Sequence, residues 1–378
     1  MNRLIGVEEE LLLVDADTYM PTPLSLDVVG TAAGWRRLPS GALLELEVKR
    51  EQIEVVSPPL RSYGELLEAL EAGRSDADAA ARRFGARAVA LATSPLECAS
   101  HTVPSARYEK MSERFGLTMI EQLTCGFHVH VSVASAEEGV GILDRIRPWL
   151  PTVLALSANS PFWHGADSGF ASYRYQAWGR WPGAGPYDVF GSVDAYAETV
   201  KRAVDTGVSL DRGMIYFDAR LSAHVPTVEI RIADVCMFPR DAAALAVLVR
   251  ALVETAAMEW SLGIPPVPAS TGLLRLASWR ASRSGISSSL LHPITGLPCP
   301  APEVVSLTLA HAAAHFCDQE EQLLVRSAVR EILRRGTGAT RQRSVAAEGT
   351  LAQVVANATL RVRPTGRTPA RSPSRSQS

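Results

Sequence analysis

The stretch GVEEELLLVD, residues 6–15, places three consecutive glutamates, Glu8 to Glu10, at the start of an otherwise apolar run. Alternating and apolar residues of this kind favour a β-strand, in which successive side chains point to opposite faces. Glu8 and Glu10 then share one face, and Glu9 points to the other. We therefore expect Glu8 and Glu10 to belong to a polar site, and Glu9 to be the replaceable residue of the three.

Three other predicted strands also combine an apolar face with a polar one. The polar faces carry His128 and His130 within TCGFHVHVSVAS (124–135), Glu229 and Arg231 within PTVEIRIAD (226–234), and Gln52 and Glu54 within ALLELEVKREQIEVVSP (42–58). The last stretch predicts two strands around a charged turn at Lys49 and Arg50. Each pattern alone also fits a solvated strand or a cross-strand ion pair, so the joint occurrence carries the prediction of a shared site.

If these faces converge, carboxylates, imidazoles and a guanidinium group line one pocket. Carboxylates that face one another repel unless a cation lies between them. Mg²⁺ prefers oxygen ligands, and a histidine ligand is compatible with Mg²⁺ and Mn²⁺ alike. Arg231 is suited to a transferring phosphoryl group or to a substrate carboxylate. The set therefore favours nucleotide phosphates held by metal ions on a sheet.

The composition excludes several other classes of protein. The chain has 378 residues, 47% of them hydrophobic, and a net charge of −2, which gives no reason to expect nucleic-acid binding. It contains neither a GxxxxGK[ST] phosphate loop nor an HExxH motif. We find no signal peptide, and no apolar run approaches the ~20 residues of a membrane span. The five cysteines include no CxxC pair, so we expect packed, reduced thiols in a cytoplasmic protein.

The remaining segments predict a sheet followed by a helical C-terminal third. Helices are expected at 62–85, 105–116, 137–157, 194–206, 240–262, 270–283, 302–313, 319–335 and 340–357, and further strands at 86–95 and 213–222. Ser62 and Glu65 form a candidate capping box. This order indicates an α+β fold with an antiparallel sheet. The Arg-, Pro- and Ser-rich tail at 361–378 is predicted to be disordered.

The aromatic, glycine-rich segment 157–191 has little periodicity, and loops of this length are uncommon unless they are functional. We expect it to wall or cover the site, with Arg174 and Arg180 as candidate contacts for phosphate or carboxylate. Asp218 and Arg220 either extend the polar wall or pair with each other.

Five stretches together resemble the glutamate–cysteine ligase type 2 family, the carboxylate-amine ligases. They are GVEEELLLVD, EQIEVVSPP, CGFHVHVSV, LSANSPFWHGADSGFASYR and TVEIRIAD, in this order. The resemblance covers roughly residues 3–360 and implies one catalytic domain over 1–360. The implied fold is an antiparallel sheet curved into a funnel and flanked by helices, similar to that of glutamate–cysteine ligase proper and of glutamine synthetase.

The resemblance also implies an activity: ATP phosphorylates the γ-carboxylate of glutamate, and the amine of cysteine displaces the phosphate. It implies ATP and two or three Mg²⁺ ions, with Mn²⁺ as an alternative, and a homodimer. The implied metal ligands are Glu8, Glu10, Glu54, His128 and Glu229, with Glu47 as a looser candidate. His130 resembles a residue near the nucleotide phosphates, and Arg231 one that steadies the acyl-phosphate. Arg174, Arg180 and Arg220 are candidate contacts for substrate or phosphate.

Three alternatives stay open at this point. The enzyme joins another acid–amine pair in specialised metabolism, or it is a metal-dependent hydrolase that activates water on the same polar face. The third alternative is a binding protein that retains the fold and lacks catalysis.

Overall fold

The computed structural model of the chain describes residues 3–359. The predicted tail, residues 361–378, lies outside this range. An open antiparallel sheet of eight strands runs through the described part in the order β2-β3-β4-β1-β6-β10-β9, and β5 pairs with β1. The strands are β1 (Ile5–Asp15), β2 (Trp35–Arg37), β3 (Leu43–Leu46), β4 (Gln52–Val56), β5 (Ala86–Val89), β6 (Gly126–Ser132), β9 (Ala219–Leu221) and β10 (Thr227–Asp234). The predicted α+β fold is confirmed.

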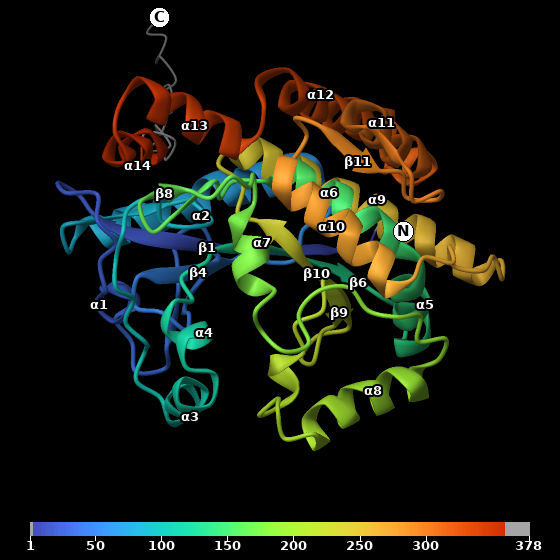
Figure 1. The fold of residues 1–378 in the computed structure, drawn as a ribbon, viewed down its shortest axis with the longest axis horizontal. Helices are drawn as coiled ribbons and strands as arrows, with labels where there is room; N and C mark the ends of the chain where they lie inside the picture. Colours follow the sequence, from blue (N-terminus) through green and yellow to red (C-terminus); the bar gives the residue numbers. More distant parts are fainter. Residues whose placement is uncertain (1–2, 360–378) are drawn as a thin grey trace, which may run out of the picture.

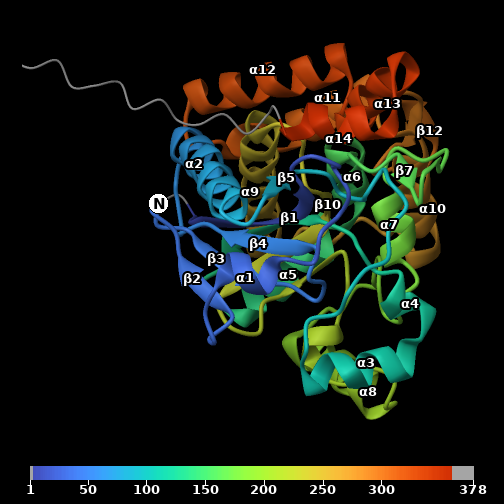
Figure 2. The same ribbon diagram turned by 90° about the vertical axis from the view of Figure 1, so that its left-hand side faces the viewer.

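Helices cover one face of this sheet and leave the other face open to a cavity. The α-helices are α1 (Ser25–Val29), α2 (Tyr63–Arg82), α3 (Ala106–Phe115), α4 (Leu117–Ile120), α5 (Ala136–Ile146), α6 (Leu150–Ser157), α7 (Tyr173–Trp178), α8 (Val193–Asp205), α9 (Pro239–Ser261), α10 (Thr271–Ser284), α11 (Ala301–His311), α12 (Gln319–Arg335), α13 (Gly338–Glu348) and α14 (Leu351–Thr359). In Figure 1, α2, α6 and α9 lie above the sheet, and α3 and α8 lie below it. The turned view in Figure 2 shows the same separation.

The apolar faces of the strands and the buried helix α9 form the main core. Phe127, Val129 and Ile230 are at most 2% exposed and pack in one cluster with Leu245 and Leu248 of α9. Because side chains alternate along a strand, burying this face turns the neighbouring polar residues to the other side of the sheet. The core therefore determines which residues reach the cavity.

The strand register places polar residues of neighbouring strands opposite one another. Glu8 of β1 pairs with His128 of β6, and Glu10 pairs with Glu54 of β4. Glu229 of β10 stands opposite His130. Directly opposite side chains lie about 5 Å apart at their Cβ atoms, so the four strands form one continuous polar surface.

Several predicted elements are shorter or broken. Within the predicted helix 137–157, two prolines mark a 3₁₀ turn at Arg147–Trp149 that separates α5 from α6, since proline removes a backbone donor. Of the predicted strand 213–222 only β9 is a strand, and Arg212–Met214 forms a 3₁₀ turn. The segment 157–191 is a hairpin of β7 (Phe162–Trp163) and β8 (Ala166–Asp167) followed by α7. The capping box of Ser62 and Glu65 is confirmed.

Two further structural features concern the helices and the thiols. Among residues 3–359, no helix has both the length and the apolar character that crossing a membrane requires. All five cysteines lie within this range and are free, and Cys125 and Cys236 are buried. Burial raises the pKa of both of these thiols well above the usual value, which keeps them protonated and unreactive.

Candidate functional site

A cavity of about 1030 Å³ lies against the polar face of the sheet. Its inner lining comprises Glu8, Glu47, Glu54, His128, His130, Glu229 and Arg231, all from the sheet or the turn after β3. Its outer wall comprises Tyr196, Ala197 and Val200 of α8, Arg107 of α3, and residues 211–213, 215 and 220–224. The polar faces predicted from four strands therefore meet in one cavity.

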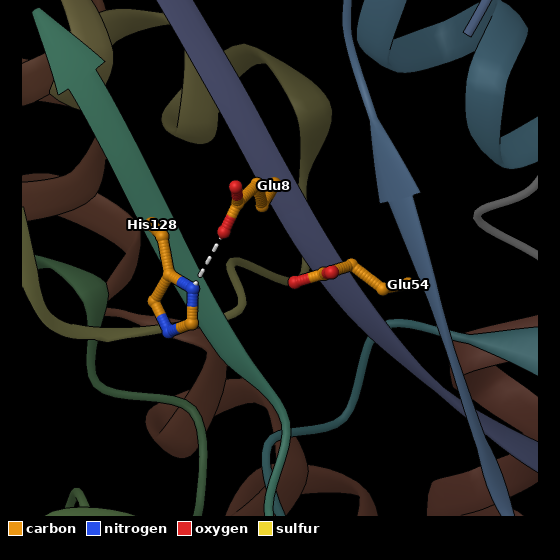
Figure 3. A group of neighbouring side chains, drawn as sticks. All are labelled: Glu8, Glu54 and His128. Carbon is orange, nitrogen blue, oxygen red and sulfur yellow. Dashed lines mark hydrogen bonds and ion pairs between the residues drawn. The ribbon is translucent and has the colours of Figure 1, made fainter. Parts of the chain in front are cut away.

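Glu8 stands at the centre of the inner lining between the two histidines. Its Oε2 lies 3.0 Å from Nδ1 of His128, and its Oε1 lies 3.0 Å from Nε2 of His130. Burial acts to raise the pKa of Glu8, but the hydrogen bonds from both imidazoles outweigh it and hold that pKa well below its usual value. Figure 3 shows Glu8, Glu54 and His128 extending from three neighbouring strands on the same side of the sheet.

The two histidines occupy different electrostatic environments. Burial and the charge of Arg231 lower the pKa of His128. For His130, burial also acts to lower the pKa, but the hydrogen bond with Glu8 and the negative charges of Glu8 and Glu229 raise it. The Nδ1 of His130 lies 2.9 Å from Oγ1 of Thr227, so this hydroxyl orients the ring and leaves Nε2 toward Glu8.

A second cluster, of Glu10, Glu47 and Glu54, contains three carboxylates and no histidine. Burial and the neighbouring negative charges raise the pKa of Glu47 to about 8, and that of Glu54 well above its usual value. The backbone N–H of Gly126 donates to Oε2 of Glu10 at 2.6 Å. Like charges gathered in this way are stable in their ionised form only when a cation lies among them.

The described residues contain three groups whose ligand atoms lie within 4.8 Å of one another. They are Glu8–Glu54–His128, Glu8–His130–Glu229 and Glu10–Glu47–Glu54. Every residue predicted as a metal ligand belongs to at least one group, and so does the looser candidate Glu47. Glu8 and Glu54 each belong to two groups, so the three positions are adjacent.

Glu229 is held between two arginines. Arg220 donates from Nε to its Oε2 at 2.7 Å and from Nη2 to its Oε1 at 3.2 Å, and Nη1 of Arg231 also pairs with Oε1. Burial acts to raise the pKa of Glu229, but the two guanidinium groups lower it to about 2. The guanidinium carbon of Arg231 lies 5.9 Å from the ring centre of Trp178. Glu229 is therefore ionised, and Arg231 is held at the inner end of the cavity.

Glu9 points away from the cavity, as predicted, but it is not a free position. Its carboxylate is 2% exposed and accepts from Nε and Nη2 of Arg74 in α2, at 2.8 and 2.5 Å. Arg74 also donates to the carbonyl oxygens of Cys236 and Met237. The expectation that Glu9 is replaceable was therefore wrong, because its partner comes from a helix 65 residues away.

Three arginines predicted to contact phosphate or substrate have other positions. Arg180 pairs with Glu121 at 2.5 Å outside the cavity lining. Arg174 is buried at the start of β6, on the same side as the side chain of His128, and its Nη1 and Nη2 lie 3.4 and 3.3 Å from the carbonyl oxygens of Ile232 and Arg231. Arg220 lines the cavity but is bonded to Glu229. The structure therefore brings Arg220 to the cavity and leaves Arg174 and Arg180 outside its lining.

Gly126 leaves the space in which Arg174 packs against β6 beside His128. A Cβ at Gly126 would lie 2.3 Å from Nη2 of Arg174 and 3.1 Å from Nε2 of His128. Only glycine leaves this space.

The segment 157–191 supports the sheet and contributes no residue to the cavity lining. The hydroxyls of Ser160 and Ser172 both donate to the buried Asp234 at the end of β10, at 2.7 Å each. The N–H of Asn159 donates to the same carboxylate at 2.8 Å. Trp178 is the aromatic residue of this segment that contacts Arg231. The segment expected to wall or cover the site thus supports β10 instead, and other segments line the cavity.

Apart from Arg220, the residues of the outer wall were missed by sequence reasoning. Asp211, Arg212 and His224 lie in short turns without strand or helix periodicity. Arg107 of α3 pairs with Asp211 at 2.7 Å, and both residues line the cavity. Asp218 and Arg220 do not pair with each other: Asp218 accepts from the hydroxyl of Tyr175 at 3.1 Å. Of the two alternatives predicted for Asp218 and Arg220, their mutual pairing is wrong, and Arg220 extends the polar wall as the other alternative states.

With this geometry in view, the chain can be compared with known proteins. The sequence profile of "Glutamate-cysteine ligase family 2(GCS2)" matches residues 4–357. The chain belongs to glutamate–cysteine ligase family 2. The predicted resemblance is confirmed, and the matched range includes every residue of the cavity lining.

Relatives in this family are similar over nearly their whole length. A protein of Paenarthrobacter aurescens named "Putative glutamate--cysteine ligase 2-1" is 53% identical over 344 residues, which cover 90% of each chain. A protein of Streptomyces coelicolor named "Putative glutamate--cysteine ligase 2" is 46% identical over 355 residues, which cover 94% of this chain and 97% of the relative.

Solved structures extend the comparison to more distant proteins. A glutamate–cysteine ligase of Francisella tularensis, in complex with AMP, matches with a TM-score of 0.69 at 13% identity, over 98% of this chain and 90% of that one. A bifunctional glutathione synthetase of Pasteurella multocida matches with a TM-score of 0.67 at 16% identity, over 96% of this chain and 53% of that one. At these identities the likeness shows a shared fold.

Proposed function

We propose that this family member is an ATP-dependent, ADP-forming carboxylate-amine ligase that joins the γ-carboxylate of glutamate to the amine of cysteine. The observation that carries the proposal is one cavity in which Glu8, both histidines and Glu229 meet beside Arg231. The names of the relatives and the AMP complex of the Francisella tularensis ligase support an acid–amine ligation that uses a nucleotide.

The donor set of the cavity fits Mg²⁺, with Mn²⁺ as an alternative. Glu47 and Glu54 are buried beside like charges, which raises the pKa of both, and a divalent cation removes this repulsion. The residues that would hold the ions are Glu8, Glu10, Glu54, His128 and Glu229. Bound ions would supply the positive charge that neutralises nucleotide phosphates.

The remaining residues position the reactants and stabilise charge. In the proposed reaction, the γ-carboxylate attacks the terminal phosphorus of ATP and ADP leaves. Arg231, held against Trp178, stabilises the negative charge on the phosphoryl oxygens during this transfer. His130, oriented by Thr227, lies near the same phosphates. The amine then attacks the acyl carbon, phosphate leaves, and the amine loses a proton.

The walls of the cavity serve the same reaction, because an acyl-phosphate must be shielded from water. α8 and residues 211–213, 215 and 222–224 line the cavity beyond the edge strand β9. These residues bound the site of the reacting groups beyond the sheet.

An ADP-release assay tests the proposal. Purified protein with Mg²⁺ and ATP should release ADP only when an acid and an amine are both present, with glutamate and cysteine as the most effective pair. Release with a different pair would identify another ligase activity, and product formation without ATP would indicate a hydrolase. Binding of ATP without turnover of any pair would indicate a non-catalytic protein.

The variant Glu8→Gln probes the proposed metal ligands directly. Removing a charge shared by two ligand groups should lower ADP formation by at least about 100-fold. The fold should stay intact, because Glu8 lies on the cavity face. Full activity in this variant would contradict the metal assignment.

A further inference from the structure

Arg212 is an arginine in the cavity lining that no carboxylate of residues 3–359 neutralises. The other lining arginines are paired, Arg107 with Asp211 and both Arg220 and Arg231 with Glu229. An unpaired guanidinium in a cavity of this size offers a planar fork of donors that matches a carboxylate. The outer wall therefore carries a free positive charge, whereas the inner lining is acidic.

The backbone on both sides of Arg212 is held from two directions. From α3, Arg107 donates to both oxygens of Asp211, at 2.7 and 3.1 Å. From β9, Nη1 of Arg220 donates to the carbonyl oxygens of Gly213 and Ile215, at 3.3 and 2.9 Å. The neighbouring Met214 is 1% exposed. Because the segment is fixed before any ligand arrives, binding there costs less conformational entropy.

A short series of contacts connects this wall to the proposed reaction centre. Arg220 of β9 pairs with Glu229 of β10, and Glu229 pairs with Arg231. Neighbouring strands lie about 4.8 Å apart. The segment that carries Arg212 is attached to β9, one strand away from the strand of Arg231. Arg220 thus contacts both the backbone beside Arg212 and the carboxylate that pairs with Arg231, so an acid with one carboxylate beside Arg231 and a second at the wall would extend past a single side chain.

We propose that Arg212 is a specificity-determining residue that binds a second carboxylate of the acid substrate. The enzyme then selects a short dicarboxylic amino acid over a monocarboxylic one of the same length. The imidazole of His224, which also lines the cavity, supplies a further hydrogen-bond donor. This inference rests on the proposed ligase reaction and adds the residue that recognises the acid.

Two substrates and two variants test the assignment. L-Glutamate and 4-aminobutyrate share the reacting carboxylate, but 4-aminobutyrate lacks the second one. Arg212→Gln should raise the KM for glutamate about 10- to 100-fold and leave the KM for ATP within about twofold. It should also abolish the preference for glutamate over 4-aminobutyrate. Arg212→Lys should restore part of this preference, since the charge is kept and the fork is lost.

The control is Arg202→Gln, which removes an exposed arginine of α8 that lies outside the cavity lining. It should leave both KM values unchanged. A rise in the KM for ATP alone in Arg212→Gln would assign Arg212 to a nucleotide phosphate and overturn the proposal. An equal rise in KM for both acids would also overturn the proposal, because Arg212 would then not bind the second carboxylate.

Calorimetry separates failure of this inference from failure of the ligase reaction. If the wild type releases no ADP with any acid–amine pair, the ligase proposal fails, but binding of glutamate is still measurable in the presence of Mg²⁺. Binding to the wild type and loss of that binding in Arg212→Gln would support the site. Equal binding to both proteins, or none to either, would overturn it.

Discussion

Replacing Glu9 by glutamine should destabilise the fold much more than the same change at Glu8, one residue earlier. The Glu9 carboxylate is 2% exposed and its partner Arg74 is 3% exposed, so water cannot replace either group. In Glu9→Gln, the Arg74 guanidinium stays buried among the carbonyl oxygens of Cys236 and Met237 without a counter-charge. Glu8→Gln removes a charge from a water-accessible cavity and leaves the core unchanged.

The size of the effect follows from the burial of the pair. Removing one partner of a buried ion pair costs about 3–5 kcal/mol, because the other charge remains uncompensated. The entropy of unfolding is about 2.1 cal/mol/K per residue, or roughly 0.75 kcal/mol/K for residues 3–359. Glu9→Gln should therefore lower Tm by about 4–7 °C relative to Glu8→Gln.

Thermal unfolding followed by circular dichroism measures this difference, with ADP release measured in parallel. The expected pattern is crossed: Glu8→Gln is stable and inactive, whereas Glu9→Gln is less stable and active at low temperature. The double variant Glu9→Leu/Arg74→Met should recover most of the loss, since an apolar pair of similar volume needs no counter-charge. Equal Tm values for Glu8→Gln and Glu9→Gln would refute the buried-pair reasoning.

Two other predictions follow from the pKa shifts. Glu54→Gln should raise Tm in metal-free protein at pH 8, because the raised pKa of Glu54 means that its ionised form costs folding free energy. Added Mg²⁺ should stabilise the wild type and not this variant. A lower Tm of the variant than of the wild type without metal would contradict the prediction. Burial raises the pKa of Asp218 to about 7, so the folded state keeps a proton that the unfolded state loses above about pH 4. Wild-type stability should fall as pH rises from about 4 to 7, and Asp218→Asn, measured by urea unfolding across this range, should gain on the order of 2–4 kcal/mol over the wild type. A pH-independent difference between these two proteins would show that Asp218 does not titrate in this window.

The sequence was sufficient to predict the inner half of the site. Side chains alternate between the two faces of a strand, and the apolar face of each strand must be buried in the core. Glu8, Glu54, His128 and Glu229 were therefore assigned to one side without knowledge of strand order, and the structure brings them together. Because the alternation of side chains depends only on position along a strand, it can be used without knowing which strands pair.

The outer half could not be predicted in this way. Arg212 and His224 lie in turns, where no periodicity fixes the direction of a side chain. The partners of charged residues were also hidden, because an ion pair depends on contacts between distant segments. Glu9 pairs with Arg74, and Arg180 pairs with Glu121. Arg220 was assigned to substrate or phosphate, or to Asp218, and its carboxylate partner is Glu229 across the β9–β10 ladder.

The central position of β1 has a consequence for how the chain folds during synthesis. The N-terminal half of β1 pairs with β6, and the paired residues Glu8 and His128 are 120 positions apart in the sequence. At about 5–20 residues per second, a ribosome needs roughly 6–24 s to make that partner. During this time the strand has an unpaired edge, which is a template for aggregation. Three adjacent negative charges oppose such pairing. They act on the nascent strand before Glu8 reaches the cavity, Glu10 joins Glu47 and Glu54, and Glu9 pairs with Arg74.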